Sequence, residues 1–507
     1  MSTALVWFRR DLRLADNPAL SAACREHERV LPVFIHAPDE EAPWAPGAAS
    51  RWWLQHSLTA LGEALARKGV PLVIRRGPTR EALQALIRET GATAVYWNRL
   101  YEPAPVARDT GLKRALREQG IRAESFDGNV LHEPWAVMNG SGEPYRVFTP
   151  YWKAVARMEQ PRPLPEPAAL PGPALRTPSL ALAELGLLPS IPWDKGLREA
   201  WTPGEAGARA RLAAFLDGIW IDYDSARNLP GRPGVSRLSP HLHFGELSPR
   251  QVWAAIGARC GNQPLESHGG ESFLRELAWR EFAIYVLWHW PQSADQPLQA
   301  RFAEYPWAED YARPLAAWQH GRTGYPLVDA GLRELWTTGW MHNRVRMTVA
   351  SFLTKNLRIP WQEGARWFWD TLVDADLAAN SLGWQWSAGC GVDAAPYFRV
   401  FNPVRQGEQY DADGAYVRRW LPELDPLPDK YLHAPWTLPA ADSVRTGFVQ
   451  ISNSNEGDVD IDDVTVTYPG TDVVALAPTS LLLRRGLVTA VVGPSGVGKS
   501  TLLAALQ

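Results

Sequence analysis

The last fifteen residues of the chain contain the pattern G-x-x-x-x-G-K-S, in which Gly493, Gly498, Lys499 and Ser500 occupy the defining positions. In such a loop, backbone N–H groups at the start of a helix surround phosphate groups, the lysine contacts them and the serine hydroxyl holds magnesium. An apolar strand-like run precedes the pattern and a helix-like run follows it, as this chemistry requires. The chain ends eight residues after Lys499, before a further carboxylate could be delivered, so we expect no ATPase activity.

Two other stretches have the spacing that places chemically useful side chains on one helix face. Glu276, Trp279 and Arg280 lie at i, i+3 and i+4, which brings together a carboxylate, an indole and a guanidinium. A second face of this kind is formed by Trp340, Asn343, Arg344 and Met347. Taken alone, these spacings favour two amphipathic helices whose Trp and Met fill the core while Glu and Arg pair at the surface.

The composition is that of an ordinary globular protein. Of the 507 residues, 46% are hydrophobic and 21% are charged, and no apolar run approaches the roughly 20 residues of a membrane span. We therefore expect no membrane insertion. Cys24, Cys260 and Cys390 have no metal-ligand spacing and form no disulfide framework, which indicates a reducing cytoplasm and no metal site. The 25 tryptophans are unusually many, and indoles can stack on bases or carry electrons.

The elements that must position these residues divide the chain into four parts. Residues 1–135 alternate short apolar strands with amphipathic helices, which predicts an α/β domain with a doubly wound parallel sheet. Residues 136–205 contain a run of prolines and are interpreted as an interdomain linker. Residues 206–440 show long helical periods and predict an all-α domain. Residues 448–507 form a short β/α fragment around the phosphate-loop pattern.

The formal charge is unevenly distributed. Residues 448–507 hold three basic and six acidic residues, which accounts for the net charge of −3 of the whole chain. The body is formally neutral, so any affinity for nucleic acid must come from a local basic patch.

Several motifs in the body resemble those of the DNA photolyase and cryptochrome family. They are VWFRRDLRLADNPAL near the start, WREF, TGYPLVDAGLRELWTTGWMHNRVRM, DADLAAN and GWQWSAGCGVDAAPYFRVFNP. The resemblance covers residues 3–440 in order and is strongest to bacterial class I cyclobutane pyrimidine dimer photolyases. It implies an α/β antenna-chromophore domain, a helical FAD-binding domain and light-driven repair or signalling.

The same resemblance implies a pocket for a DNA lesion. Glu276 and Asn343 would hydrogen-bond the pyrimidine edges, while Trp279, Met347 and Trp386 would wall a cavity that opens onto the flavin. A lesion is unreachable inside a duplex and must be flipped out, at a cost that damage lowers. The partner is therefore ultraviolet-damaged DNA, bound by a monomer. The matching positions for contacts to the DNA backbone are Arg227, Arg344, Arg399 and Lys153.

The positions matching FAD contacts are spread over the helical part. They are Tyr223, Ser236, Arg237, Leu238, Ser239, Arg280, Trp340, Arg346, Asp374, Asp376 and Asn380. Serine hydroxyls and backbone amides suit the pyrophosphate, and Asp374 can pair with Arg346 near the isoalloxazine. At position 235 this chain has valine where the family more commonly has threonine, so we expect one hydrogen bond to an FAD phosphate to be lost and the affinity for FAD to be lower.

Two positions bear on the reaction. Asn380 matches the residue facing flavin N5, where an amide is typical of photolyases and an acidic residue or cysteine is typical of cryptochromes. Enzymes for pyrimidine-pyrimidone photoproducts place extra histidines near the lesion, whereas this region supplies only His342, which both classes share. The resemblance therefore favours cyclobutane dimers as the substrate.

Three tryptophans match the indole chain that re-reduces the flavin from the surface in this family. These are Trp384, Trp361 and Trp307, and the alternative is that they are core aromatics. In the first domain, Glu102 matches a carboxylate that binds the second chromophore of some members. The antenna is methenyltetrahydrofolate or a deazaflavin, with another flavin or an empty site left open.

Two other functions are carried as alternatives. A cryptochrome-type light sensor would keep the fold and FAD and signal through the extra residues after Gly447. A nucleotide-binding protein is the second, because residues 464–503 resemble the beginning of an ABC-transporter nucleotide-binding domain, truncated after the phosphate loop, with Tyr468 where such domains stack adenine.

Overall fold

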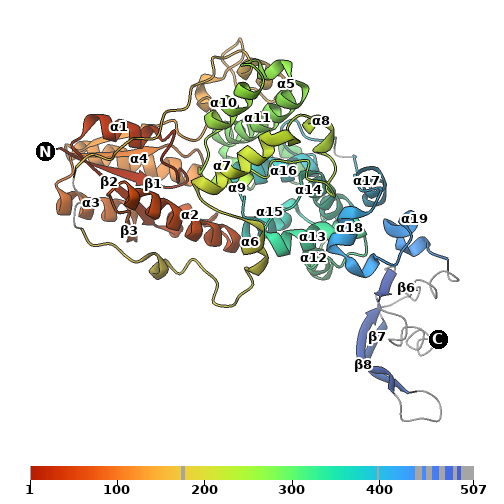
Figure 1. The fold of residues 1–507 in the computed structure, drawn as a ribbon. Coiled ribbons are helices and arrows are strands. Elements are labelled where there is room, and N and C mark those ends of the chain that lie inside the picture. The colour runs from red at the N-terminus through yellow and green to blue at the C-terminus, as the bar shows by residue number, and fades with distance from the viewer. Residues whose placement is uncertain are drawn as a thin grey trace.

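A computed structural model describes residues 2–172, 177–396 and 399–439, together with the backbone of four strands further along the chain. The ribbon shows a sheet-containing part at the N-terminal end, a larger helical part beside it, and the four strands extending away from the helical part (Figure 1). Among the described helices, none is both long and apolar enough to cross a membrane.

Five parallel strands form the centre of the first part, in the order β3-β2-β1-β4-β5. They are β1 (Thr3–Phe8), β2 (Arg29–His36), β3 (Val73–Arg76), β4 (Ala94–Asn98) and β5 (Arg122–Phe126). The strand order reverses direction around β1, which confirms the doubly wound parallel sheet. All six residues of β1 and all five of β4 are buried, so both faces of the sheet are covered at these strands. This is why their sequences are nearly continuous apolar runs.

Four helices connect these strands, and further short helices follow the sheet. The connecting helices are α1 (Pro18–Glu26), α2 (Ala48–Arg67), α3 (Thr79–Thr90) and α4 (Pro103–Glu118). Segment 136–205, interpreted as a linker, contains α5 (Phe148–Val155) and α6 (Lys195–Ala200). α5 packs on the long helix α11 through Phe148, which stacks on Trp279 with ring centres 3.8 Å apart. Part of this segment therefore belongs to the packed helical layer.

The second part is helical, as the periodicity predicts. Its helices are α7 (Glu205–Ala214), α8 (Tyr223–Ala226), α9 (Ser239–His243), α10 (Pro249–Arg259), α11 (His268–His289), α12 (Ala312–Gln319), α13 (Pro326–Thr338), α14 (Asn343–Ser351), α15 (Trp361–Thr371), α16 (Leu377–Ala388), α17 (Pro403–Tyr410), α18 (Ala415–Trp420) and α19 (Asp429–Leu432). α16 packs against both α11 and α15, and α13 packs against α14. Figure 1 shows α11, α14 and α16 close together in this part.

The turn between α13 and α14 corrects one expectation from the sequence. Gly339 ends α13 in the left-handed conformation, with φ 67°, and the His342 side chain accepts the N–H of Arg344 as the N-cap of α14. Trp340 therefore lies in the turn, whereas Asn343 is the first residue of the helix. The expected helix face of Trp340, Asn343, Arg344 and Met347 was wrong, because the glycine breaks the helical period before Trp340.

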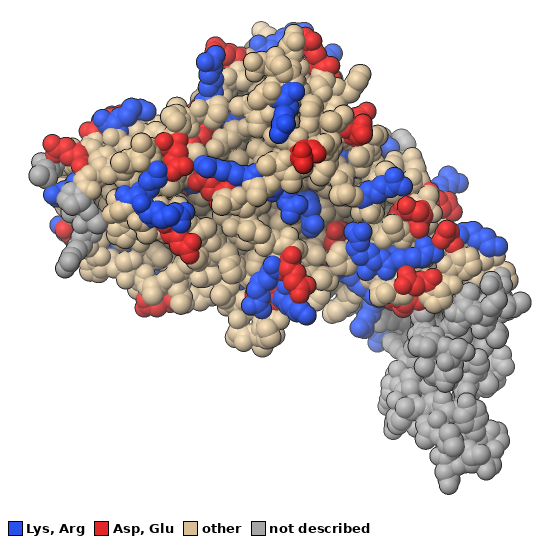
Figure 2. Space-filling view, in the orientation of Figure 1, with Lys and Arg blue, Asp and Glu red and all other residues tan. Residues whose placement is uncertain are grey.

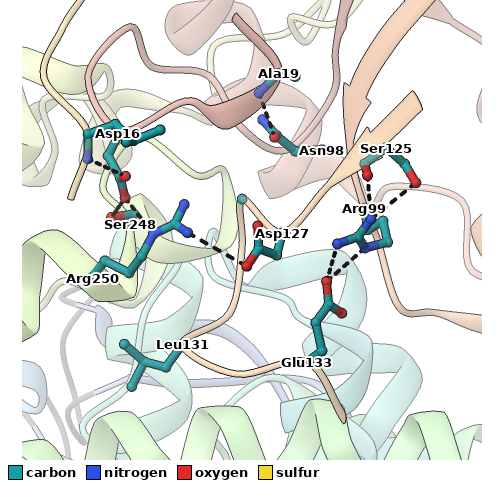
Figure 3. A network of polar contacts seen from close by, with 12 residues as sticks. Asp16, Ala19, Asn98, Arg99, Ser125, Asp127, Leu131, Glu133, Ser248 and Arg250 are labelled. Carbon is teal, nitrogen blue, oxygen red and sulfur yellow. Dashed lines mark hydrogen bonds and ion pairs between the residues drawn. The ribbon is translucent and has the colours of Figure 1, made fainter. Parts of the chain in front are cut away.

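A buried polar seam joins the sheet part to the helical part. Asp16 accepts hydrogen bonds from the Ser248 hydroxyl and from Arg250 Nε, the latter at 3.0 Å (Figure 3). Arg13 donates to the carbonyls of Asp16, Gly128 and Gly245 at 2.6–2.8 Å. Because the contacts of Asp16 with Ser248 and Arg250, and of Arg13 with Gly245, link residues more than 200 positions apart, they fix how the two parts meet.

The four C-terminal strands are β6 (Phe448–Ser452), β7 (Val459–Thr467), β8 (Val474–Leu483) and β9 (Val488–Val492). β6 pairs with β9 and β7 pairs with β8, both antiparallel. β9 directly precedes the phosphate-loop pattern, where a strand was expected. Gly493, Gly498, Lys499, Ser500 and Tyr468 lie outside the described residues, so the ABC-type fragment stays a prediction.

Candidate flavin and lesion site

The turn after α13 gathers an aromatic and charged cluster. The guanidinium of Arg237 makes two cation–π contacts, at 4.6 Å from the ring centre of Trp201 and 4.6 Å from that of Trp340. Arg346 makes a two-pronged ion pair with Asp374, at 2.9 and 3.1 Å, and also donates to the Met341 carbonyl. Four predicted flavin residues are thus brought together around the same turn.

This cluster contains buried donors that have no partner within the described chain. They are Nε of Arg237 and Nε2 of His342. Burial, together with the neighbouring arginines, lowers the pKa of His342 to about 3, so its ring is neutral at physiological pH. An unpaired buried donor is costly unless a ligand satisfies it. Two guanidiniums, an indole and unpaired donors fit a flavin dinucleotide, whose phosphates are anionic and whose ring is planar and rich in acceptors.

A second group of predicted flavin residues faces the sheet part. Arg280 on α11 donates to the Asn129 carbonyl at 3.0 Å and to Glu281 at 2.9 Å. Asp376 caps α16 by accepting the N–H of Ala379 and contacts Nδ1 of His243 at 3.3 Å. Burial acts to raise the pKa of Asp376, but the contact with His243 and the charge of Arg280 lower it overall, so this carboxylate is ionised.

Arg280 and Asp376 line a cavity of about 360 Å³ together with Glu102, the predicted antenna residue. Glu102 forms an ion pair with Arg10 at 2.7 Å, and its second oxygen has no partner among the described residues. The structure thus brings the antenna candidate and two flavin candidates to one hollow between the two parts of the molecule.

A larger cavity, of about 750 Å³, adjoins this one and is lined in part by residues of PGAASRWWL and NRLYEPAP, two segments that resemble those lining the second-chromophore site in this family. Arg10, Leu100 and His243 line both cavities, and the larger one also contains Arg9, Arg108, Trp7 and Trp369. It lies at the carboxyl ends of β1, β2 and β4, where open parallel sheets bind ligands.

The remaining flavin candidates lie on the short helices α8 and α9, in the loop before α9, and on α16. Tyr223 is buried edge-on against Phe215 and Phe273, and Leu238 is buried beside it in the same core cluster. Ser239 begins α9, and its hydroxyl accepts from Trp340 Nε1 at 3.4 Å. The Ser236 hydroxyl accepts from the Leu238 N–H at 3.4 Å. The side-chain amide of Asn380 donates to the Ala365 carbonyl at 2.9 Å.

The predicted lesion residues come from three helices. Glu276, on α11, forms an ion pair with Arg227, one of the predicted DNA contacts. Asn343 is exposed at the first position of α14, and Met347 is half-buried one turn later. Trp279 has one ring face covered by Phe148, and the Trp386 ring lies 5.9 Å from that of Phe401. The cavity walled by these two indoles stays a prediction.

The predicted DNA contacts differ in their surroundings. Arg344 bonds the Asn228 side chain and lies 4.5 Å from the Tyr410 ring centre, close to the charges of Arg227 and Arg399. Arg399 and Lys153 are exposed, and Lys153 lies on α5. On the face shown in Figure 2, basic side chains are interspersed with acidic ones.

The three tryptophans of the predicted electron chain lie in one aromatic core. Trp384 and Trp361 are buried in the same cluster, and the half-buried Trp307 packs against it. Trp384 lies edge-on to Phe368, with ring centres 5.0 Å apart. A Cβ on Gly364 would meet the Trp384 ring at 2.0 Å, so a glycine is required where α15 meets this indole. Trp361 and Trp307 line a common cavity of about 340 Å³.

Comparison with known proteins agrees with this arrangement. Residues 4–168 match the family model described as DNA photolyase, and residues 273–463 match the FAD binding domain of DNA photolyase. The deoxyribodipyrimidine photo-lyase of Agrobacterium fabrum is 45% identical, over 89% of this chain and 93% of its own length. Cryptochrome-2 of Arabidopsis thaliana is 42% identical, over 90% and 76%. The crystal structure of a bacterial class III photolyase from Agrobacterium tumefaciens superposes with a TM-score of 0.84 at 44% identity, covering 88% of this chain and 92% of that chain.

Proposed function

Because the chain belongs to the DNA photolyase and cryptochrome family, we propose that it is a deoxyribodipyrimidine photo-lyase that splits cyclobutane pyrimidine dimers in ultraviolet-damaged DNA. The observation that carries the proposal is the turn between α13 and α14. Within eight residues it presents Trp340 and Arg346 to the flavin cluster and exposes Asn343 toward solvent, where a flipped-out lesion would enter. One short segment thereby serves both the cofactor and the substrate.

The residues of this turn and its neighbours would hold the flavin as follows. Arg237 and the unpaired donor of His342 suit its anionic and acceptor groups, while the Arg346–Asp374 pair fixes a charge beside its ring. Bound reduced FAD supplies the light absorption and the electron that opens the cyclobutane ring and then returns. The protein positions the lesion, excludes water and holds Asn380 through Ala365.

Lesion binding requires Glu276 to exchange partners. In the structure its carboxylate is paired with Arg227, both side chains being about one-third exposed. A lesion that offers N–H donors would take up the Glu276 oxygens, and the released Arg227 would turn to a DNA phosphate. The pair therefore holds two recognition groups in place until DNA arrives.

The segment GWMHNRVRM supplies no histidine besides His342, which supports cyclobutane dimers over pyrimidine-pyrimidone photoproducts as the substrate. Nδ1 of His342 accepts the Arg344 N–H, and burial among arginines keeps the ring neutral, with a pKa of about 3. A histidine in this state is a poor proton donor at neutral pH, and proton donation is what the second substrate needs. Electron transfer to a cyclobutane ring needs no such donor.

For the subgroup, we favour class III over the class I predicted from the motifs. The class III enzyme of Agrobacterium tumefaciens is 44% identical and superposes over 88% of this chain. The second chromophore would bind in the paired cavities lined by Arg9, Arg10, Arg108 and Glu102, whose cations suit an anionic folate or flavin. An absorption spectrum of the purified protein identifies the chromophore.

The decisive experiment is illumination of the reduced protein with an oligonucleotide that contains one dimer. We expect blue-light-dependent loss of the dimer, strongly reduced in Glu276→Ala and Asn343→Ala. The matched controls are Glu271→Ala, on the same helix, and exposed Asn262→Ala. Full repair by both lesion-pocket variants would contradict the pocket, and no repair by the wild type would contradict the function.

Light sensing is the second candidate, favoured by the 42% identity to an Arabidopsis cryptochrome. The two functions differ in their affinity for damaged DNA. A repair enzyme binds the dimer-containing oligonucleotide much more tightly than the undamaged one, whereas a sensor shows no such preference.

A further inference from the structure

The cavity beside Trp307 and Trp361 is lined by none of the residues predicted to contact the flavin or the lesion. It is a small hollow that is partly open to solvent. It lies where α15 begins and α16 ends. The residues that line it are Pro297, Phe302, Ala303, Tyr305, Trp307, Trp361, Gln362, Ala388 and Cys390.

The lining combines aromatic rings with one unused acceptor. The rings of Tyr305 and Trp307 lie 4.4 Å apart at 51°, with Trp361 on the same cavity. Gln362 donates through Nε2 to the Asp295 carbonyl at 3.2 Å, but its buried Oε1 has no hydrogen-bond partner within the described chain. A buried acceptor without a partner is costly and is satisfied by a ligand that carries a donor.

The charge of the lining restricts the ligand further. No lysine or arginine is among the described residues that line the cavity, so an anionic ligand gains no ion pair with its walls. Burial raises the pKa of the Cys390 thiol to about 12, which keeps it neutral. A neutral, planar molecule with hydroxyl donors matches a lining that combines aromatic rings with an amide oxygen.

We propose that this cavity binds a small aromatic diol of the hydroquinone class, which supplies electrons to the outer end of the tryptophan chain. The inference rests on the proposed function, because it assumes that Trp384, Trp361 and Trp307 carry electrons inward. An aromatic ring in contact with Trp307 or Trp361 places the donor next to the indole that has lost an electron. Gln362 orients the hydroxyl without taking its proton.

The electrons and protons balance for complete reduction of the cofactor. One hydroquinone loses two electrons and two protons and becomes a quinone. The two electrons pass singly through the indoles, each restoring an oxidised indole to its neutral form. Two electrons and one of the two protons would reduce bound oxidised FAD fully to its anionic form, and the second proton would be released to water.

The test compares two variants with the same substitution in flavin-loaded protein. Ala303→Phe adds a ring at an exposed residue that lines the cavity, whereas Ala316→Phe adds one at an exposed residue of α12 outside it. We expect the photoreduction rate of the wild type to saturate with hydroquinone concentration. The half-saturating hydroquinone concentration should rise about tenfold in Ala303→Phe and in Gln362→Leu, which is the loss of affinity expected when one hydrogen bond or its equivalent is removed. It should stay unchanged in Ala316→Phe.

Two further measurements separate this inference from the proposed function. Calorimetry in the dark should show hydroquinone binding to the wild type and its weakening in Ala303→Phe. Repair by chemically reduced protein should be equal in all variants, because that reaction bypasses the indole chain. The inference would be overturned if the photoreduction rate rose linearly with hydroquinone concentration and calorimetry showed no heat of binding. It would also be overturned if Ala303→Phe and Ala316→Phe had equal effects, and in both cases repair would be intact. Absent repair would instead overturn the proposed function.

Discussion

Arginines are used differently at the seam between the two parts and at the turn after α13. At the seam, Arg13 and Arg250 are buried and their donors are directed at carbonyls and at the Asp16 carboxylate (Figure 3). At the turn, Arg237 lies between two indole rings, and its Nε has no acceptor within the described residues. Most seam donors reach protein acceptors, and Nη2 of Arg250 is the one seam donor without an acceptor among the described residues. At the turn, the unpaired donor of Arg237 lies beside two indoles, where a ligand could accept from it.

This difference separates structural charge from functional charge. A cation whose acceptors all come from the protein contributes to stability and cannot bind a ligand without breaking contacts. A cation held by ring faces keeps its edge donors available, because cation–π contacts use only the faces of the guanidinium. We therefore expect seam substitutions to change the free energy of unfolding and turn substitutions to change cofactor affinity.

The largest expected effect is at the seam. Arg250→Met leaves the fully buried Asp16 carboxylate without its countercharge and should lower the free energy of unfolding by about 3–5 kcal/mol. Urea denaturation measures this loss. The control is Arg366→Met, whose 62%-exposed side chain pairs with Glu363 and whose loss should cost less than about 1 kcal/mol. Equal losses in the two variants would contradict the structural role of the seam.

Glu281 gives the seam a predicted pH dependence. It accepts the Leu131 N–H and a bond from Arg280, but burial raises its pKa from 4.5 to about 7. Between these values the folded protein binds a proton that the unfolded chain has released. Stability therefore falls as the pH rises from about 4.5 to about 7, by on the order of 3 kcal/mol in total.

The Glu281→Gln variant isolates this contribution. Glutamine keeps an acceptor for the Leu131 N–H and does not titrate. The difference in unfolding free energy between variant and wild type should grow from pH 5 to pH 7 in favour of the variant and become constant above about pH 8. Urea titrations at four pH values measure it. A constant difference over the whole range would show that Glu281 does not titrate in this interval.

Local pattern predicted the parts of the molecule that depend on neighbours in sequence. The apolar runs of β1 and β4 and the helical spacing of Glu276, Trp279 and Arg280 all appear in the structure as expected. The period failed at Gly339, where a positive φ and an unusual histidine cap begin a new helix at Asn343. Histidine is not a usual N-cap, so pattern alone gave no signal there.

Contacts between distant residues were out of reach of the sequence. Trp201 lies 36 positions before Arg237, in the segment interpreted as a linker, yet it provides half of the ring contacts of that arginine. The cavity lined by Arg9, Arg108 and Trp369 exists only because the sheet and the helices meet along the seam. The family motifs identified individual flavin residues, but their grouping on two sides of the molecule depends on this packing.

The smallest expected change in stability is at the turn. In Arg237→Met the two ring contacts are lost but a methionine still packs between Trp201 and Trp340, so the free energy of unfolding should fall by about 1–2 kcal/mol. The affinity of the flavin-free protein for FAD should fall at least about tenfold, because a charged donor to the cofactor is removed. Fluorescence titration with FAD measures the second effect and urea denaturation the first.

The control for this substitution is Arg237→Lys, which keeps the charge but not the planar stack. Lysine has a single ammonium group on a flexible stem, so it cannot hold a fixed edge between two indoles. We expect its FAD affinity to lie between that of the wild type and that of Arg237→Met. The contrary result is that Arg237→Met loses as much unfolding free energy as Arg250→Met and binds FAD normally. That result would show that the arginine at the turn is structural, like those of the seam, and would contradict the distinction between the two clusters.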